Sequence, residues 1–216
     1  MDLPRRLAEH ATPLPIEQLR AELPAAASAL ARLQERGFMV CNGLTPELLG
    51  EAALIASEPH IGVPYPEDKR TFGHDTQLDT ALQKGMAGFA LLGPQSRRHT
   101  RPLVGYGWLQ DKDSENFESN GVQHAVRIRE KWQGQGLAAD FSRAVLGTGK
   151  VLYGANQVRA DFWMDDRRAA HVAQQLGFSL QACVEQERVT QKGRVMGEKL
   201  QVALDVQGPL QGANYY

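Results

Sequence analysis

A glycine-rich turn between a predicted strand and a predicted helix constrains this chain more than any other stretch. Residues 122–128 form a short β-type run, and residues 137–146 carry apolar side chains at helical spacing. Gly134 and Gly136 lie between them. The N-terminus of a helix offers unpaired N–H groups and the positive end of the helix dipole, and glycine leaves room for an anion because it has no Cβ. The turn therefore predicts a site for a phosphate-containing ligand.

Three interpretations of this turn are open when it is taken alone. As Gly134-x-Gly136-x-x-Ala139 it fits the dinucleotide-binding fingerprint of an NAD-binding oxidoreductase, and Asp161 lies near the expected downstream acid. As Gln133-x-x-Gly136-x-Ala138 it resembles the [Gln/Arg]-x-x-Gly-x-[Gly/Ala] loop of the GNAT N-acetyltransferase superfamily. The third interpretation is a turn that joins a strand to a helix and binds nothing.

The order of the predicted elements separates these interpretations. The chain predicts helices at 16–36 (interrupted or kinked near Pro24), at 45–57, around 78–82, at 137–146 and from Asp166 to Gly177. It predicts strands at 38–41, 86–92, 103–110, 121–128, 158–164, 181–188 and 199–206. The last two strands suggest a final hairpin, with residues 190–193 in a long loop between them. A dinucleotide loop follows the first strand of a parallel unit, whereas this loop follows several closely spaced strands. The dinucleotide interpretation is therefore the remote one.

A second motif supports the resemblance to the GNAT superfamily. Many members carry Asn-x-x-Ala, then six residues, then Leu-Gly-Phe. Here Asp166 stands at the Asn position, Ala169 follows, and residues 176–178 read Leu-Gly-Phe at the same offset. The resemblance implies an α/β (α+β) fold with a mixed, mostly antiparallel central sheet flanked by helices. It divides the chain into an arm with an extra N-terminal helix (1–36), an acetyltransferase domain (37–206) and a tail (207–216).

The resemblance also implies where acetyl-CoA binds. In the family the pantetheine arm pairs with the strand before the glycine loop, and the loop wraps the pyrophosphate. The implied cofactor-binding residues are Val126, Arg127, Ile128, Gln133, Gly134, Gln135, Gly136, Leu137, Ala138, Ala139 and Asp166.

Acetyl transfer to an amine requires a group or a water molecule that takes the amine proton. His124 is the candidate catalytic base, because it lies on the strand that leads to the cofactor site and an ordinary histidine titrates near neutral pH. Tyr106, Asp161 and Glu130 are weaker candidates. Ala173 stands where many GNAT enzymes carry a tyrosine that protonates the leaving thiolate. No grouping of residues has metal-ligand spacing, so we expect no metal.

Composition excludes several classes of partner. The formal net charge of the 216-residue chain is −1, so nucleic-acid binding has no compositional support. No apolar run is long enough to cross a bilayer, and no secretory signal is evident. The two cysteines, Cys41 and Cys183, do not indicate a disulfide scaffold. We therefore expect a cytoplasmic protein without nucleic-acid or membrane partners.

Two functions from different classes follow. The leading hypothesis is an acetyl-CoA-dependent N-acetyltransferase whose acceptor is a primary amine of a small molecule, a peptide or a protein. The alternative is a non-catalytic CoA-binding or regulatory protein on the same fold, which the alanine at position 173 motivates. The apolar stripe of the N-terminal helix must pack against the domain or a second subunit, so a homodimer is one of two expectations.

Overall fold

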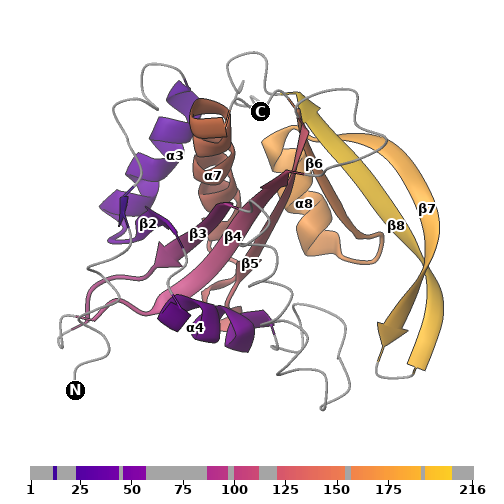
Figure 1. Ribbon diagram of the computed structural model, residues 1–216, viewed down its shortest axis with the longest axis horizontal. Helices are drawn as coiled ribbons and strands as arrows, with labels where there is room; N and C mark the ends of the chain where they lie inside the picture. Colours follow the sequence, from indigo (N-terminus) through magenta and orange to yellow (C-terminus); the bar gives the residue numbers. More distant parts are fainter. Residues whose placement is uncertain are drawn as a thin grey trace.

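One mixed sheet, with strand order β1-β2-β3-β4-β5-β6-β8-β7, carries the described part of the chain (Figure 1). The computed structural model describes residues 12–13, 23–43, 46–56, 87–96, 100–111, 121–153, 157–190 and 193–205. The elements are β1 (Thr12–Pro13), α3 (Pro24–Glu35), β2 (Met39–Asn42), α4 (Pro46–Ala56), β3 (Ala87–Leu92), β4 (Leu103–Asp111), β5 (Gly121–Ile128), η1 (Glu130–Trp132), α7 (Leu137–Tyr153), β6 (Gln157–Trp163), α8 (Arg167–Leu176), β7 (Ser179–Thr190) and β8 (Gly193–Asp205).

Neighbouring strands are antiparallel throughout the sheet except at β5 and β6. These two strands run parallel and pair over only three positions, from Gly121↔Gln157 to Gln123↔Arg159. Beyond Gln123, β5 continues to pair with β4 on its other edge as far as Ile128. The sheet therefore forks between β5 and β6, and the predicted mixed, mostly antiparallel fold is confirmed.

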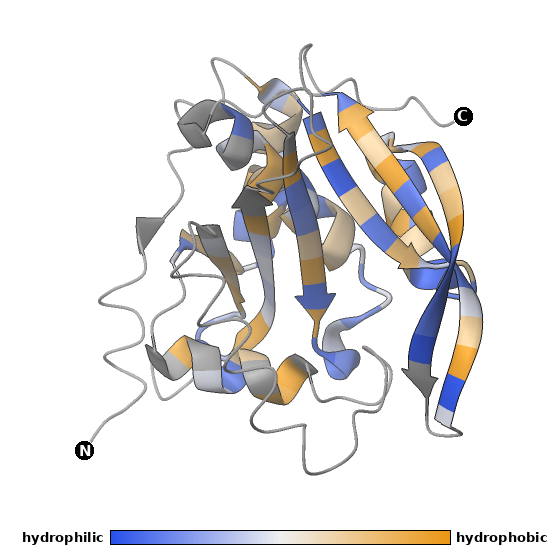
Figure 2. Cartoon of the chain, turned by 45° about the vertical axis from the view of Figure 1, so that its right-hand side comes forward, coloured by the Kyte–Doolittle hydropathy of each residue, from blue (hydrophilic) through white to orange (hydrophobic). Residues whose placement is uncertain are grey.

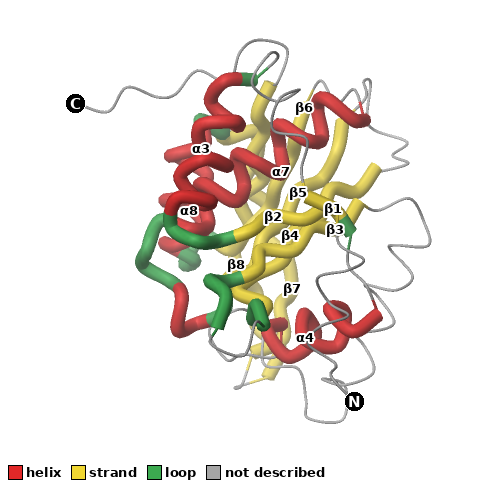
Figure 3. Tube along the Cα trace, turned by 90° about the vertical axis from the view of Figure 1, so that its left-hand side faces the viewer, coloured by secondary structure: helices red, strands yellow, loops and turns green. Residues whose placement is uncertain are grey.

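The helices divide between the two faces of the sheet. Figure 3 shows α3, α7 and α8 on one side and α4 on the other. On the α7 face, Leu30 and Leu33 of α3 join Leu137 and Phe141 of α7 in the larger core. On the α4 face, a smaller core joins residues of α4 to buried side chains of β2, β3 and β4.

Helix α7 lies close to the sheet because β4 has no side chain beneath it at Gly107. A Cβ there would stand 3.5 Å from the Phe141 ring and 3.0 Å from Val126. The helix also runs beyond the predicted end at residue 146, to Tyr153. Its extra turns include the fully buried Thr148, whose hydroxyl donates to the Ala144 carbonyl (2.9 Å) and so satisfies a polar group inside the core.

The structure describes the predicted helix at 16–36 only in part. Helix α3 begins at Pro24, where the prediction placed an interruption or a kink, because proline suits the first turn of a helix, where its missing N–H costs nothing. The upstream part of that predicted helix, residues 16–22, and the predicted helix around 78–82 lie outside the described residues. The described apolar stripe of α3, including Leu23, is buried inside its own subunit.

The predicted long loop around residues 190–193 is wrong. Strand β7 extends to Thr190 and β8 begins at Gly193, so the predicted hairpin is present but its strands are longer than expected and pair up to Thr190↔Gly193. Residues 191–192 lie outside the described residues. The tip of this hairpin extends away from the helices in Figure 1. The residues of the hairpin tip are mostly exposed. Charged side chains therefore interrupt the alternation of hydrophobic and polar residues that marks a half-buried strand. That alternation is visible along other strands in Figure 2.

Candidate active site

The open edge of β5 is the first component of the site. The N–H of Arg129 donates to Val104 on β4 (2.8 Å), so the alternation of an antiparallel ladder directs the backbone groups of Val126 and Ile128 to the opposite edge. Pairing with β6 on that edge stops at Gln123. Arg127 differs from its two neighbours, because its backbone groups face β4 at Tyr106.

The glycine loop follows this edge directly. Gly134 and Gly136 have φ of 72° and 74°, a left-handed conformation that favours glycine, and a Cβ on either residue would meet no atom within 4 Å. Gly136 begins helix α7, since its carbonyl accepts the first helical bond from the N–H of Asp140 (3.3 Å). The exposed backbone from Gly134 to Gly136 therefore leads into a helix N-terminus with open space around it.

Gln133 ties this loop to two other elements. Its side-chain amide donates to the Ile128 carbonyl (2.8 Å), which is one of the groups on the open edge of β5. Its side-chain oxygen accepts from the guanidinium of Arg168 in the first turn of α8. Asp166 caps α8 by accepting from the N–H of Ala169 (3.0 Å). The structure therefore brings the glycine loop and the second sequence motif together across the fork.

A stack of two aromatic rings lies on the α4 face beside β5. Tyr106 and Trp108 of β4 are parallel at 5.7 Å between ring centroids, and the Arg127 guanidinium lies 6.0 Å from the Trp108 ring. Burial raises the pKa of the Tyr106 hydroxyl, so this group stays protonated at neutral pH. This face of β5 is thus polar and aromatic, whereas the α7 face of the same strand is apolar.

A carboxylate lies at the point where β5 and β6 separate. Asp161 stands two residues beyond the last β6 residue that pairs with β5, and it accepts from the side-chain amide of Gln123 (2.7 Å). Its other oxygen forms an ion pair with Lys199 of β8. Its side chain remains 24% exposed, so solvent reaches it. Gln123 and Lys199 were missed from the sequence, although an alternating polar pattern on β5, β6 and β8 marks them as residues of one face.

His124 is on the opposite face of β5. Its ring is 6% exposed, and Nε2 lies 3.1 Å from the Ser142 hydroxyl on the buried side of α7. Burial lowers its pKa to about 4, so the ring is neutral at neutral pH but enclosed between sheet and helix. The structure does not bring His124 together with Tyr106, Arg127 or Asp161, and its position does not support the predicted role of general base.

The remaining sequence candidates lie elsewhere. Glu130 is exposed in η1. Ala173 is buried on the inner side of α8. Among the side chains that the structure describes, no group of three or more His, Cys, Asp or Glu residues is placed to hold a metal ion.

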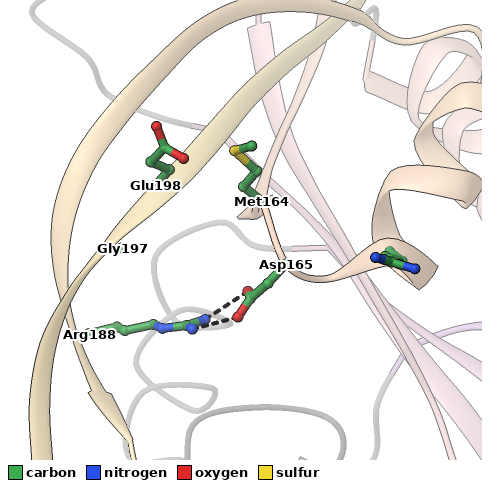
Figure 4. A pocket seen from close by; sticks show the side chains of 6 residues that line it. Met164, Asp165, Arg188, Gly197 and Glu198 are labelled. Carbon is green, nitrogen blue, oxygen red and sulfur yellow. Dashed lines mark hydrogen bonds and ion pairs between the residues drawn. The ribbon is translucent and has the colours of Figure 1, made fainter.

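An open pocket of about 540 Å³ lies where β6 turns into α8, beside the β7–β8 hairpin. In Figure 4, Arg188 and Asp165 point toward one another, and they form two hydrogen bonds of 2.8 and 2.5 Å. This hydrogen bonding lowers the pKa of Asp165. Met164, Gly197 and Glu198 complete the wall that the figure labels. The lining includes two acidic residues, Asp165 and Glu198, and two arginines, Arg167 and Arg188, so its formal charges balance and favour neither a cation nor an anion.

The family comparison matches most of the chain. The model of the family described as "Acetyltransferase (GNAT) domain" matches residues 17–179, a range that includes α3, the glycine loop and α8. No curated protein has a sequence that matches this chain significantly. None of the helices in the described ranges is both long and apolar enough to cross a membrane.

Many solved structures share the fold at low sequence identity. A putative acetyltransferase from Salmonella typhimurium, solved with its cofactor acetyl-CoA, is 16% identical, with 82% of this chain and 99% of that chain covered and a TM-score of 0.58. A ribosomal-protein-S5-alanine acetyltransferase from Vibrio fischeri is 11% identical, with 83% and 96% covered and a TM-score of 0.57. A spermidine N-acetyltransferase mutant from Vibrio cholerae is 14% identical, with 78% and 94% covered and a TM-score of 0.59.

Burial of His124 predicts a specific pH dependence of stability. The folded pKa of about 4 lies below the ordinary value of about 6.5, so the unfolded chain binds a proton that the folded chain does not. The free energy of unfolding should therefore fall as pH drops from about 6.5 to about 4, by up to about 1.4 kcal/mol per pH unit. The substitution His124→Gln should remove this dependence of the unfolding free energy on pH, as measured by denaturant unfolding between about pH 4 and 6.5. His171→Gln, at an exposed position on α8, should leave the slope unchanged; equal slopes in wild type and His124→Gln would contradict the burial account.

Proposed function

The chain belongs to the GNAT acetyltransferase family, and from this premise we propose that it is an N-acetyltransferase that uses acetyl-CoA. The acceptor is a primary amine of a small molecule, a peptide or a protein. One observation carries the proposal: the open edge of β5 leads directly into the glycine loop at the N-terminus of α7, where the sheet forks. A thioester carrier with amide groups at one end and phosphates at the other fits such a continuous polar track.

The residues along the track suit the two halves of acetyl-CoA. The N–H groups of Val126 and Ile128 on the open edge of β5 can donate to carbonyls of the pantetheine arm, as in pairing with one more strand. The carbonyls of these two residues already accept from the side chains of Arg127 and Gln133. The loop and first turn of α7, residues 133–139, supply N–H groups and a positive helix end for the pyrophosphate. Arg127 contributes its side chain on the α4 face rather than its backbone. Asp166 acts indirectly, by capping α8, the helix whose Arg168 contacts Gln133 of the loop.

The transfer itself requires a face that the amine can reach. We propose that the acceptor enters on the α4 side and that its nitrogen forms a bond to the thioester carbon while the carbon–sulfur bond breaks. Asp161, at the fork and accessible to solvent, takes the amine proton directly or through water. Ala173 has no proton to give to the departing thiolate. We assign that proton to water, because the CoA thiol is a fairly good leaving group.

The acceptor is proposed only as a class. A spermidine acetyltransferase and a ribosomal-protein-S5-alanine acetyltransferase share this fold, so the fold accommodates both a small polyamine and a protein substrate. A cytoplasmic location fits two free cysteines and the absence of a spanning helix in the described part. A homodimer stays a prediction, and it would use a surface other than the buried stripe of α3.

Binding of acetyl-CoA at the glycine loop should raise the melting temperature of the protein, because a ligand that binds only the folded state stabilises it. Gly136→Asp places a negative charge and a Cβ where the pyrophosphate is expected, and it should abolish the shift. Gly43→Asp is the matched control, since Gly43 also has a positive φ of 107° and open space around it but lies at the end of β2.

The Gly43→Asp variant should be less stable than wild type, but acetyl-CoA should raise its melting temperature by as much as it does for wild type. A full shift in Gly136→Asp would show that the loop does not hold the phosphates. If NADH raises the melting temperature and acetyl-CoA does not, the oxidoreductase alternative replaces the proposal.

Catalysis is tested by release of free CoA from acetyl-CoA in the presence of a panel of primary amines. Asp161→Asn should lower kcat about 100-fold on any amine that the panel identifies, which is a typical contribution of a general base, with the Kd for acetyl-CoA unchanged. Asp205→Asn is the control, because Asp205 also accepts from a glutamine amide (Gln157, 3.0 Å) but at the far end of β6.

Full activity of Asp161→Asn would exclude Asp161 as the base. Binding of acetyl-CoA without CoA release for any amine between about pH 6 and 9 would favour the non-catalytic CoA-binding alternative.

A further inference from the structure

The last turn of helix α3 reaches the glycine loop, although it precedes the loop by about a hundred residues. The guanidinium Nη1 of Arg36 donates a hydrogen bond to the carbonyl oxygen of Gln135 (3.1 Å). Gln135 stands between the two glycines of the loop. Neither sequence motif includes Arg36, because both were defined on residues near the loop and α8.

This hydrogen bond fixes one particular peptide group. The Gln135 carbonyl and the Gly136 N–H belong to the same planar trans peptide, so they point in opposite directions. Holding the carbonyl toward α3 turns the Gly136 N–H away from α3. The torsions that flank this peptide are ψ of Gln135 and φ of Gly136, and a glycine leaves its φ less restricted than any other residue does. Arg36 therefore restrains a peptide whose orientation Gly136 alone would leave less restricted.

The start of the loop is held from the same side. The Arg36 guanidinium lies 5.4 Å from the centre of the Phe38 ring. Phe38 in turn meets Trp132 edge to face, with 5.5 Å between centroids and 81° between planes. Because Trp132 ends η1 just before Gln133, Phe38 contacts the residue that precedes the loop, and Arg36 contacts the loop itself at Gln135. Aromatic contacts of this geometry add to the stabilisation that burial alone supplies.

Separate contacts fix the body of α3 on α7. Arg32 forms two hydrogen bonds to the Asp140 carboxylate, at 2.6 and 3.3 Å, and Asp140 also faces Arg143 at 3.6 Å. Leu30 and Leu33 are buried in the core that contains Leu137. Docking of α3 thus does not depend on Arg36, which is itself exposed. This separation allows the role of Arg36 to be tested without unfolding the helix.

We propose that Arg36 is a positioning residue for the phosphate site of acetyl-CoA. Arg36 orients the Gly136 N–H before acetyl-CoA binds, so that binding does not have to restrict the rotation of this peptide and loses less conformational entropy. Its positive charge lies near phosphates that carry several negative charges, which adds to the effect. The inference rests on the proposed function, because it concerns the same glycine loop. It makes the N-terminal helix part of the cofactor site.

The test compares two arginines that lie one helical turn apart on α3. Arg36→Ala should weaken acetyl-CoA binding in calorimetry about tenfold, which corresponds to about 1.4 kcal/mol, and should raise KM for acetyl-CoA while leaving kcat unchanged. Arg36→Lys should recover part of the affinity, since it restores a donor and a charge. Arg32→Ala should lower the melting temperature through loss of the Asp140 pair but keep the wild-type affinity.

Dephospho-CoA separates positioning from direct contact with the 3′-phosphate. Under the proposal, Arg36→Ala loses the same factor of affinity for dephospho-CoA as for CoA, because the pyrophosphate is common to both. A loss seen only with CoA would overturn the positioning role in favour of a direct contact. Equal affinities of wild type and Arg36→Ala, or equal losses in Arg36→Ala and Arg32→Ala, would also overturn it. Failure of the wild-type protein to bind acetyl-CoA would instead refute the proposed function, and the inference with it.

Discussion

The separation of β5 from β6 is the constraint on which the rest of the structure depends. Backbone polar groups that lose a strand partner must find another, since an unpaired buried group is costly. The Ile128 carbonyl accepts from the side chain of Gln133, which is the first residue of the glycine motif. Val126, one pair closer to the fork, also has its groups on the open edge, where its carbonyl accepts from the Arg127 guanidinium (3.3 Å). A ligand that carries amides can pair with β5 there. The fork therefore determines where the site lies and leaves backbone groups that a ligand can satisfy.

The loop beyond the fork is held from three directions. Gln133 anchors it to β5 and, through Arg168, to α8. Arg36 reaches it from α3. Close packing of α7 on Gly107 fixes the height of the helix that follows it over the sheet. The loop therefore combines two flexible glycines with fixed surroundings, which suits a site that must approach an anion closely without paying a large ordering cost on binding.

Local patterns predicted the loop, its flanking strand and helix, and the cap of α8, because each depends on residues close in sequence. The two motifs at residues 133–138 and 166–178 also predicted the family correctly.

The sequence was a weaker guide to the face of the sheet on which each side chain lies. His124 was chosen for its residue type, and only the register against β4 and the position of Ser142 show that it points into the core. Asp161 was a candidate from the sequence, but its contacts with Gln123 and Lys199, and that of Arg36 with the loop, depend on the pairing of segments far apart in the chain. The length of the strands in the β7–β8 hairpin was underestimated, because charged residues on an exposed hairpin hide the alternation of hydrophobic and polar side chains.

The central claim is that acetyl-CoA lies along the open edge of β5 and into the glycine loop. Amide hydrogen exchange, resolved to single residues by NMR with and without acetyl-CoA, tests it most directly. The account predicts slower exchange for the N–H groups of Val126 and of residues 134–137. Arg127 serves as an internal control, because its N–H already faces β4 and should change little. Protection confined to the pocket at Asp165 and Arg188, with unchanged exchange at Val126 and Gly136, would contradict the account.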